Sequence, residues 1–191
     1  MSLDSIFLVT NFESYFSIHI PNEEAELLYT VGDVTDYICR QLHITSSDIL
    51  LKERVFSELQ KAWLEKGMIR QRIELWELVS VFFDDTPETL AVLQQASVWA
   101  IPGFPKKTTS LIHRLLPGRG HQTEADFKTL NFDGFCDAIC AANYKTLLAP
   151  KNLRSSYEVY IAVIAITIEI AGITAYEINP HKRFTDDLGI D

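Results

Sequence analysis

The most apolar stretch of the chain runs from Val159 to Ala171. It is only about half as long as the roughly 20 residues that a helix needs to cross a bilayer, and it contains the acidic Glu169. The stretch therefore predicts a buried helix, beginning near Ser156, and not a membrane span.

Helical spacing also recurs near the start of the chain. Between residues 2 and 16, apolar side chains return every three or four positions, which favours a helix with one wide buried face. Residues 22–26 are expected to form a short acidic helical turn. Thr30 can cap the next helix, with Asp33 three residues later completing a capping box. Turn-forming residues at 45–48 then mark a boundary.

The middle of the chain carries the same kind of pattern. The helices expected there span residues 55–66, 87–99, 109–116 and 129–144. Gly67 should make a turn after the first of them, followed by a second, shorter segment up to Phe83. The whole chain is therefore predicted to be all-α.

Composition limits the classes of protein that remain. The 191 residues, 47% of them hydrophobic, fit one or two small globular domains. A net charge of -9 argues against a nucleic-acid binder. Three cysteines make no even disulfide framework, and the first residues lack the basic and apolar regions of a secretory signal, so a cytoplasmic location is expected.

Two groups of residues allow a metal site or a simpler structural role. Cys136 and Cys140 lie one helical turn apart and could share a metal, but without a nearby Cys or His pair they are expected to pack in the core. Asp186, Asp187 and Asp191 lack a ligand series of defined spacing, so they are expected to cap and solvate a loop.

The remaining polar and aromatic residues do not predict an active site. The five histidines are scattered without a partner serine or cysteine, so no catalytic triad and no enzyme is expected. Trp63, Trp76 and Trp99 are expected to be core residues. Basic residues between 106 and 119 are either a solvated face or a docking patch for an acidic partner or a phosphate.

The two ends of the chain carry a motif in reversed order. The last residues read Phe184-Thr-Asp-Asp-Leu-Gly-Ile-Asp191, and the first read Met1-Ser2-Leu3-Asp4. Joined tail to head, they restore an Asp-Ser-Leu motif. This arrangement resembles the acyl carrier protein family, with the loop before its phosphopantetheine serine at the C-terminus and the part from the serine to the last helix at the N-terminus.

The resemblance implies a site at the start of the chain. Ser2 would be the attachment residue for a covalent 4'-phosphopantetheine arm, and Asp191 would be the acid before it. Leu3, Asp4 and Ile6 would form the recognition edge of the helix. The implied partners are a phosphopantetheinyl transferase and acyl-processing enzymes.

The resemblance also implies an architecture. Residues 1–44 together with 154–191 would form an acyl-carrier-type helical bundle, either within one chain as a circular permutant or between two chains as a domain-swapped homodimer. As a third possibility, the chain would be an open segment of a tandem array. Residues 45–153 would form a second helical module, which resembles a degenerate copy of the same unit. In this copy Trp99 and the Gly-Phe-Pro at 103–105 stand near the second helix.

The function that follows is the carriage of acyl groups as thioesters in fatty-acid, polyketide or related lipid synthesis. The alternative is an interaction or regulatory protein that keeps the carrier fold without the arm. Only the first of these hypotheses needs a reactive serine hydroxyl at the junction.

Overall fold

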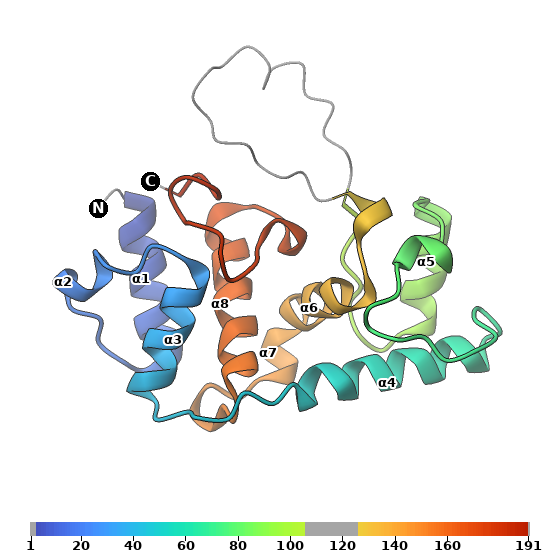
Figure 1. Cartoon of the computed structure of the whole chain (residues 1–191), viewed down its shortest axis with the longest axis horizontal. Helices are drawn as coiled ribbons and strands as arrows, with labels where there is room; N and C mark the ends of the chain where they lie inside the picture. The colour runs from blue at the N-terminus through green and yellow to red at the C-terminus, as the bar shows by residue number, and fades with distance from the viewer. Residues whose placement is uncertain (1–2, 106–125, 191) are drawn as a thin grey trace, which may run out of the picture.

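The computed structural model describes residues 3–105 and 126–190, and in these two stretches every regular element is a helix (Figure 1). The α-helices are α1 (Leu3–Phe16), α2 (Asn22–Ala25), α3 (Val31–Gln41), α4 (Leu50–Glu65), α5 (Pro87–Ala96), α6 (Phe132–Ala142), α7 (Tyr144–Leu147) and α8 (Ser156–Ala171). Short 3-10 helices are η1 (Val79–Val81), η3 (Phe127–Thr129), η4 (Pro150–Asn152) and η5 (Ala175–Glu177). The predicted all-α class is confirmed.

Helix α8 lies at the centre of the molecule (Figure 1). It packs against α1 and α3, and it also packs against α6, which belongs to the middle of the chain. Its buried residues point in several directions around the helix: Tyr157, Val159, Ile161, Ala162, Val163, Ile164, Ala165, Ile166 and Thr167. The apolar stretch of the sequence is therefore a helix that neighbours cover on more than one side.

The ends of α8 are defined by local signals. The Ser155 side chain accepts a hydrogen bond from the backbone N–H of Glu158, which caps the first turn. Gly172 follows the helix with a φ of 66°, a left-handed conformation that glycine adopts without steric cost. The start and the end of α8 thus agree with the apolar stretch that the sequence shows.

The N-terminal part contains the helices that the sequence predicts. α1 and α2 cover the expected ranges, and α3 begins with the expected capping box at Thr30 and Asp33. In α3 the apolar stripe includes Val31 and Ile38, both with no exposed surface. The side of α3 that carries this stripe faces α8, which explains why both are buried.

Several predictions for the middle are corrected. α4 begins at residue 50, not 55, because Lys52 and Leu51 are buried and extend its packed face. In the shorter segment expected after Gly67, the short η1 is the helix that forms before residue 83. α5 ends at Ala96 because the next residue is extended.

Two further expectations have different outcomes. Trp76 is 74% exposed and is not a core residue, whereas Trp63 has no exposed surface. The basic helix expected at 109–116 lies outside the described residues, as does most of the basic stretch at 106–119.

The two predicted domains share one continuous core. Buried residues of α1, α3 and α8 form a single cluster with those of α4 and α6. The division into residues 1–44 with 154–191 and residues 45–153 stays a prediction. Within the described residues, no helix is both long enough and apolar enough to span a membrane.

The central position of α8 predicts a large effect of truncating its side chains. Ile161→Ala should lower the free energy of unfolding by about 3 kcal/mol, because it leaves a cavity in a fully buried position. Urea denaturation measures the change. The matched control is Val98→Ala, at a side chain that is 85% exposed, which should change stability by less than about 0.5 kcal/mol. Equal effects of the two substitutions would contradict the position assigned to α8.

Candidate functional site

Three of the predicted site residues, Leu3, Asp4 and Ile6, lie at the beginning of α1. Ser2 and Asp191 are outside the described residues, and Leu3 is the first residue of the helix. Asp4 in the first turn is exposed, and the Ile6 side chain is 47% exposed. The described part of the recognition edge is therefore accessible to a partner.

The C-terminal segment pairs with the start of α3 through three backbone hydrogen bonds, which we call the junction clamp. Phe184 N donates to the Tyr29 carbonyl at 3.1 Å, and Val31 N donates to the Lys182 carbonyl at 3.1 Å. Gly32 N donates to the Pro180 carbonyl at 2.8 Å. Residues 29–32 and 180–184, from opposite ends of the sequence, are thus joined within one chain.

Gly32 is the tightest point of the clamp. A Cβ atom at this position would lie 2.9 Å from the Pro180 carbonyl oxygen, closer than such atoms approach in real proteins. Because the neighbour is backbone and not a flexible side chain, it cannot move aside cheaply. The glycine therefore permits the close approach of the two segments.

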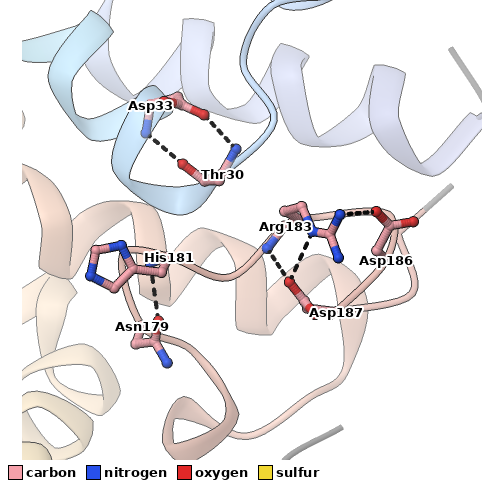
Figure 2. Close-up of polar contacts among 7 residues, drawn as sticks. All are labelled: Thr30, Asp33, Asn179, His181, Arg183, Asp186 and Asp187. Atoms are coloured by element: carbon pink, nitrogen blue, oxygen red, sulfur yellow. Dashed lines mark hydrogen bonds and ion pairs between the residues drawn. The ribbon is translucent and has the colours of Figure 1, made fainter. Parts of the chain in front are cut away.

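Figure 2 shows the polar contacts on the two sides of the clamp. On the α3 side, Asp33 N donates to Thr30 Oγ1 at 3.0 Å, and Thr30 N donates to Asp33 Oδ2 at 2.8 Å. On the other side, His181 N donates to Asn179 Oδ1 at 3.0 Å. These bonds satisfy backbone groups that the helix start and the turn would otherwise leave unpaired.

Arg183 organises the loop that follows the clamp (Figure 2). Its Nη1 lies 2.7 Å from Asp186 Oδ2, and its backbone N–H donates to Asp187 Oδ2 at 2.9 Å. The hydrogen bond from the Arg183 backbone, together with the nearby guanidinium, lowers the pKa of Asp187 below its usual value. The two carboxylates thus hold a loop, as expected.

The end of the described C-terminal segment is anchored by burial. Ile190 N donates to the Phe184 carbonyl at 2.9 Å, which closes a turn. Gly189 within the turn has a φ of 69°, so a left-handed residue is needed there. Phe184, Leu188 and Ile190 are all buried in the core. The motif of the sequence is therefore partly structural, since its apolar members hold the loop.

Gly32 and Arg183 are site residues that the sequence motifs do not include. The sequence does indicate that Gly32 is unusual, because a glycine in the first turn of a helix lowers helix propensity without evident benefit. Arg183 had a signal too, since acidic residues follow it at three and four positions. Neither signal identifies its partner segment, which comes from the other end of the chain.

The two cysteines of α6 are placed as the core interpretation predicts. Cys136 and Cys140 have no exposed surface, and burial raises the pKa of the Cys140 thiol to about 12. A protonated thiol is a poor metal ligand and a poor nucleophile. Core packing is therefore the role that the structure supports for both.

Part of this chain is similar to acyl carrier proteins. The acyl carrier protein of Porphyromonas gingivalis is 46% identical over 41 residues, which cover 22% of this chain and 53% of that protein. The acyl carrier protein of Wolinella succinogenes is 57% identical over 37 residues, or 19% of this chain and 49% of that protein. The chain thus spans about half the length of these relatives. No family model and no solved structure matches the chain.

The close approach at the clamp predicts that Gly32→Ala destabilises the fold. The new methyl group would meet the Pro180 carbonyl, so we expect a loss of about 1–2 kcal/mol despite the better helix propensity of alanine. Gly134→Ala is the matched control, because Gly134 lies in the first turn of α6 with neighbours at an ordinary 3.5 Å. The control should be neutral or stabilising in urea denaturation, and a neutral Gly32→Ala would contradict the tight contact.

The Arg183–Asp187 contact predicts a pH-dependent contribution to stability. Because the pKa of Asp187 is lowered in the folded protein, the ionised carboxylate stabilises the fold above the ordinary carboxyl pKa, and this contribution disappears as the pH falls through the folded value. Asp187→Asn should therefore cost about 1 kcal/mol at pH 7 and less in acid. Thermal unfolding across pH 3–7 (roughly the range in which carboxyl groups titrate) measures the difference.

The control for this pH series is Asp186→Asn. Asp186 contacts only the exposed guanidinium in Figure 2, so its substitution should cost less than about 0.5 kcal/mol. A stability loss for Asp187→Asn that stays constant from neutral to acid pH would argue against the ionised loop contact.

Proposed function

We propose that this protein carries acyl groups as thioesters on a 4'-phosphopantetheine arm attached to Ser2. The observation that carries the proposal is the junction clamp, which joins the C-terminal motif to the N-terminal half within one chain. The partial similarity to acyl carrier proteins supports the same function. In this proposal the protein is a carrier and not an enzyme.

The packing of α8 supports an intramolecular carrier bundle. α8 and the clamp segment come from the C-terminal part, whereas α1 and α3 come from the N-terminal part, and the two parts pack against each other. The start of α1 and the C-terminal segment lie at the same end of the molecule (Figure 1). A circular permutant needs this arrangement, and in a domain swap the same contacts would form between two chains.

The accessible start of α1 suits the chemistry of attachment. Ser2 directly precedes the helix, and a phosphate bonded to its oxygen would meet the positive end of the helix dipole. The transferase would form the bond between the serine oxygen and the phosphorus next to the pantetheine, while the pyrophosphate bond of coenzyme A breaks, adenosine 3',5'-bisphosphate leaves and the serine proton is released. The terminal thiol of the arm would then hold the acyl group as a thioester.

The exposed residues of the first turns are the proposed recognition edge. Asp4 and Ile6 are exposed in the structure, and the adjacent Phe7 is 51% exposed. A transferase and the acyl-processing enzymes would contact this edge through both charge and apolar area. Which acyl chain is carried depends on these partners.

The proposal predicts that the protein is modified at a single serine. Incubation with coenzyme A and a broad-specificity phosphopantetheinyl transferase should raise the intact mass by one phosphopantetheinyl unit. Ser2→Ala should abolish the gain, since it removes the accepting hydroxyl. Intact-mass spectrometry measures both.

The matched control is Ser5→Ala, which removes the next serine of the same helix and should leave the mass gain unchanged. Circular dichroism establishes that each variant is folded. A folded protein that gains no mass would refute the arm and favour the armless interaction protein.

A further inference from the structure

The middle of the chain contains a second clamp with the same hydrogen-bond pattern as the first. Val79 N donates to the Leu130 carbonyl at 2.9 Å. Phe132 N donates to the Glu77 carbonyl at 3.0 Å, and Asp133 N donates to the Leu75 carbonyl at 2.8 Å. These bonds join the loop after α4 to the start of α6.

The two clamps agree residue by residue. Each contains one isolated antiparallel bridge, between Thr30 and Arg183 in the first and between Asn131 and Leu78 in the second. Counted from these bridges, all three hydrogen bonds of one clamp fall on the same positions as those of the other. The bridge residue on the helix side is in both cases the N-cap, and its side chain accepts from the backbone N–H three residues later.

The helices around the clamps agree as well. The helix before the clamp loop is 16 residues long in both cases, for α8 and α4. The helix after the clamp is 11 residues long in both cases, for α3 and α6. α8 packs against α3 and α1, and α4 packs against α6 and α5. Figure 1 shows these two groups of three helices beside each other.

The agreement identifies the position in the second group that corresponds to the proposed attachment point. Asp191 follows the bridge residue Arg183 by eight positions, and Thr86 follows the bridge residue Leu78 by the same number. Thr86 is the N-cap of α5, and its hydroxyl accepts from Thr89 N at 3.1 Å. The next residue, Pro87, therefore stands at the position that corresponds to Ser2. Proline has no hydroxyl group, so this position cannot accept an arm.

The two groups meet at a buried ion cluster. Lys52 of α4 is 5% exposed, and its Nζ lies 2.6 Å from Asp133 Oδ1 and 3.0 Å from Asp137 Oδ1, both on α6. Tyr157 of α8 donates its hydroxyl hydrogen to Asp137 Oδ1 at 2.7 Å. Lys52 Nζ also lies 5.0 Å from the centre of the Tyr157 ring.

The charges in this cluster depend on one another. Burial alone would lower the pKa of Lys52, but the carboxylates of Asp137 and Asp133 raise it, so the amine stays charged. Burial raises the pKa of Asp137 against the opposing effect of Lys52. Removing the ammonium would leave the largely buried Asp137 carboxylate and the half-exposed Asp133 carboxylate without their counter-charge.

We infer that residues 50–105 and 126–142 belong to a second unit with the same arrangement of helices and clamp as the first. This second unit has no attachment residue for an arm. The Lys52 cluster holds the second unit on α8 as a permanent partner. The assignment of an armless unit rests on the proposed function, whereas the docking does not. In this arrangement α6 of the second unit packs against α8, which α1 and α3 of the first unit also contact.

The three cysteines test the docking directly. Cys140 contacts Tyr157, and both Cys136 and Cys140 are buried on α6, whereas Cys39 is buried on α3 in the first unit. Lys52→Met should speed alkylation of the α6 cysteines by roughly 100- to 1,000-fold, the order of magnitude expected when one member of a buried ion pair is removed. Alkylation of Cys39 should stay at the wild-type rate. Peptide mass spectrometry distinguishes the three sites.

Matched variants make the result specific. Lys145→Met removes an ammonium from an exposed pair with Glu169 and should leave all three rates unchanged. If Lys52→Met does not fold, Tyr157→Phe takes its place and is read at Cys136, because the hydroxyl that it removes bonds Asp137 and also contacts Cys140; about a tenfold increase is expected. Unchanged rates at all sites would overturn the docking, as would equal acceleration at Cys39, because the two units would then open together.

The number of phosphopantetheinyl groups that the chain accepts tests whether the second unit lacks an attachment residue. A chain with one carrier unit and one armless unit gains at most one phosphopantetheinyl group. A mass gain that survives Ser2→Ala would overturn the armless second unit. If Ser2 itself is not modified, the proposed function fails while the cysteine experiment still decides the docking.

Discussion

The burial of α8 is the constraint on which the other contacts depend. This helix is apolar around most of its circumference, so a single neighbouring layer cannot remove its surface from water. α1 and α3 cover one part of it, and α6 covers another. The N-terminal and middle parts of the chain are therefore held together by the segment that comes last in the sequence.

Backbone hydrogen bonds add direction to this apolar packing. Hydrophobic burial alone does not fix how far one helix slides along another, whereas the clamp sets a register between residues 29–32 and 180–184. Gly32 allows the two backbones to approach closely, and Arg183 with its two carboxylates shapes the loop beyond. These contacts together hold the loop motif against the start of α3.

The hydrogen-bond arrangement of the clamp occurs twice in the molecule. The same six backbone groups recur at the same positions in both halves, although the side chains around them differ. Backbone geometry tolerates such sequence divergence, because a peptide group bonds in the same way whichever side chain it carries. The ion pairs of Lys52 with Asp133 and Asp137 by contrast lie within the second half, where an unpaired charge would be costly, and Tyr157 of α8 joins them by its hydrogen bond to Asp137.

The sequence by itself determined the helical class, most helix positions and the local caps. The predicted starts of α3 and α8 are confirmed, because caps and periodic apolar residues act within a few positions of each other. It was wrong where packing overrides local pattern: α4 begins earlier than residue 55, and Trp76 lies on the surface. The spacing of Lys52 with Val55, Phe56 and Leu59 could have placed the lysine on the buried face, but not its acidic partners.

Only the tertiary structure decided which distant segments meet. The clamp joins residues about 150 positions apart, and no local pattern encodes such a pairing, since its bonds are made by backbone groups that every residue possesses. The same holds for Tyr157 and Asp137, which are polar residues on helices whose partners follow from packing. The sequence determined the helices and the motif at its two ends, and the burial of α8 between two groups of helices decided how they come together.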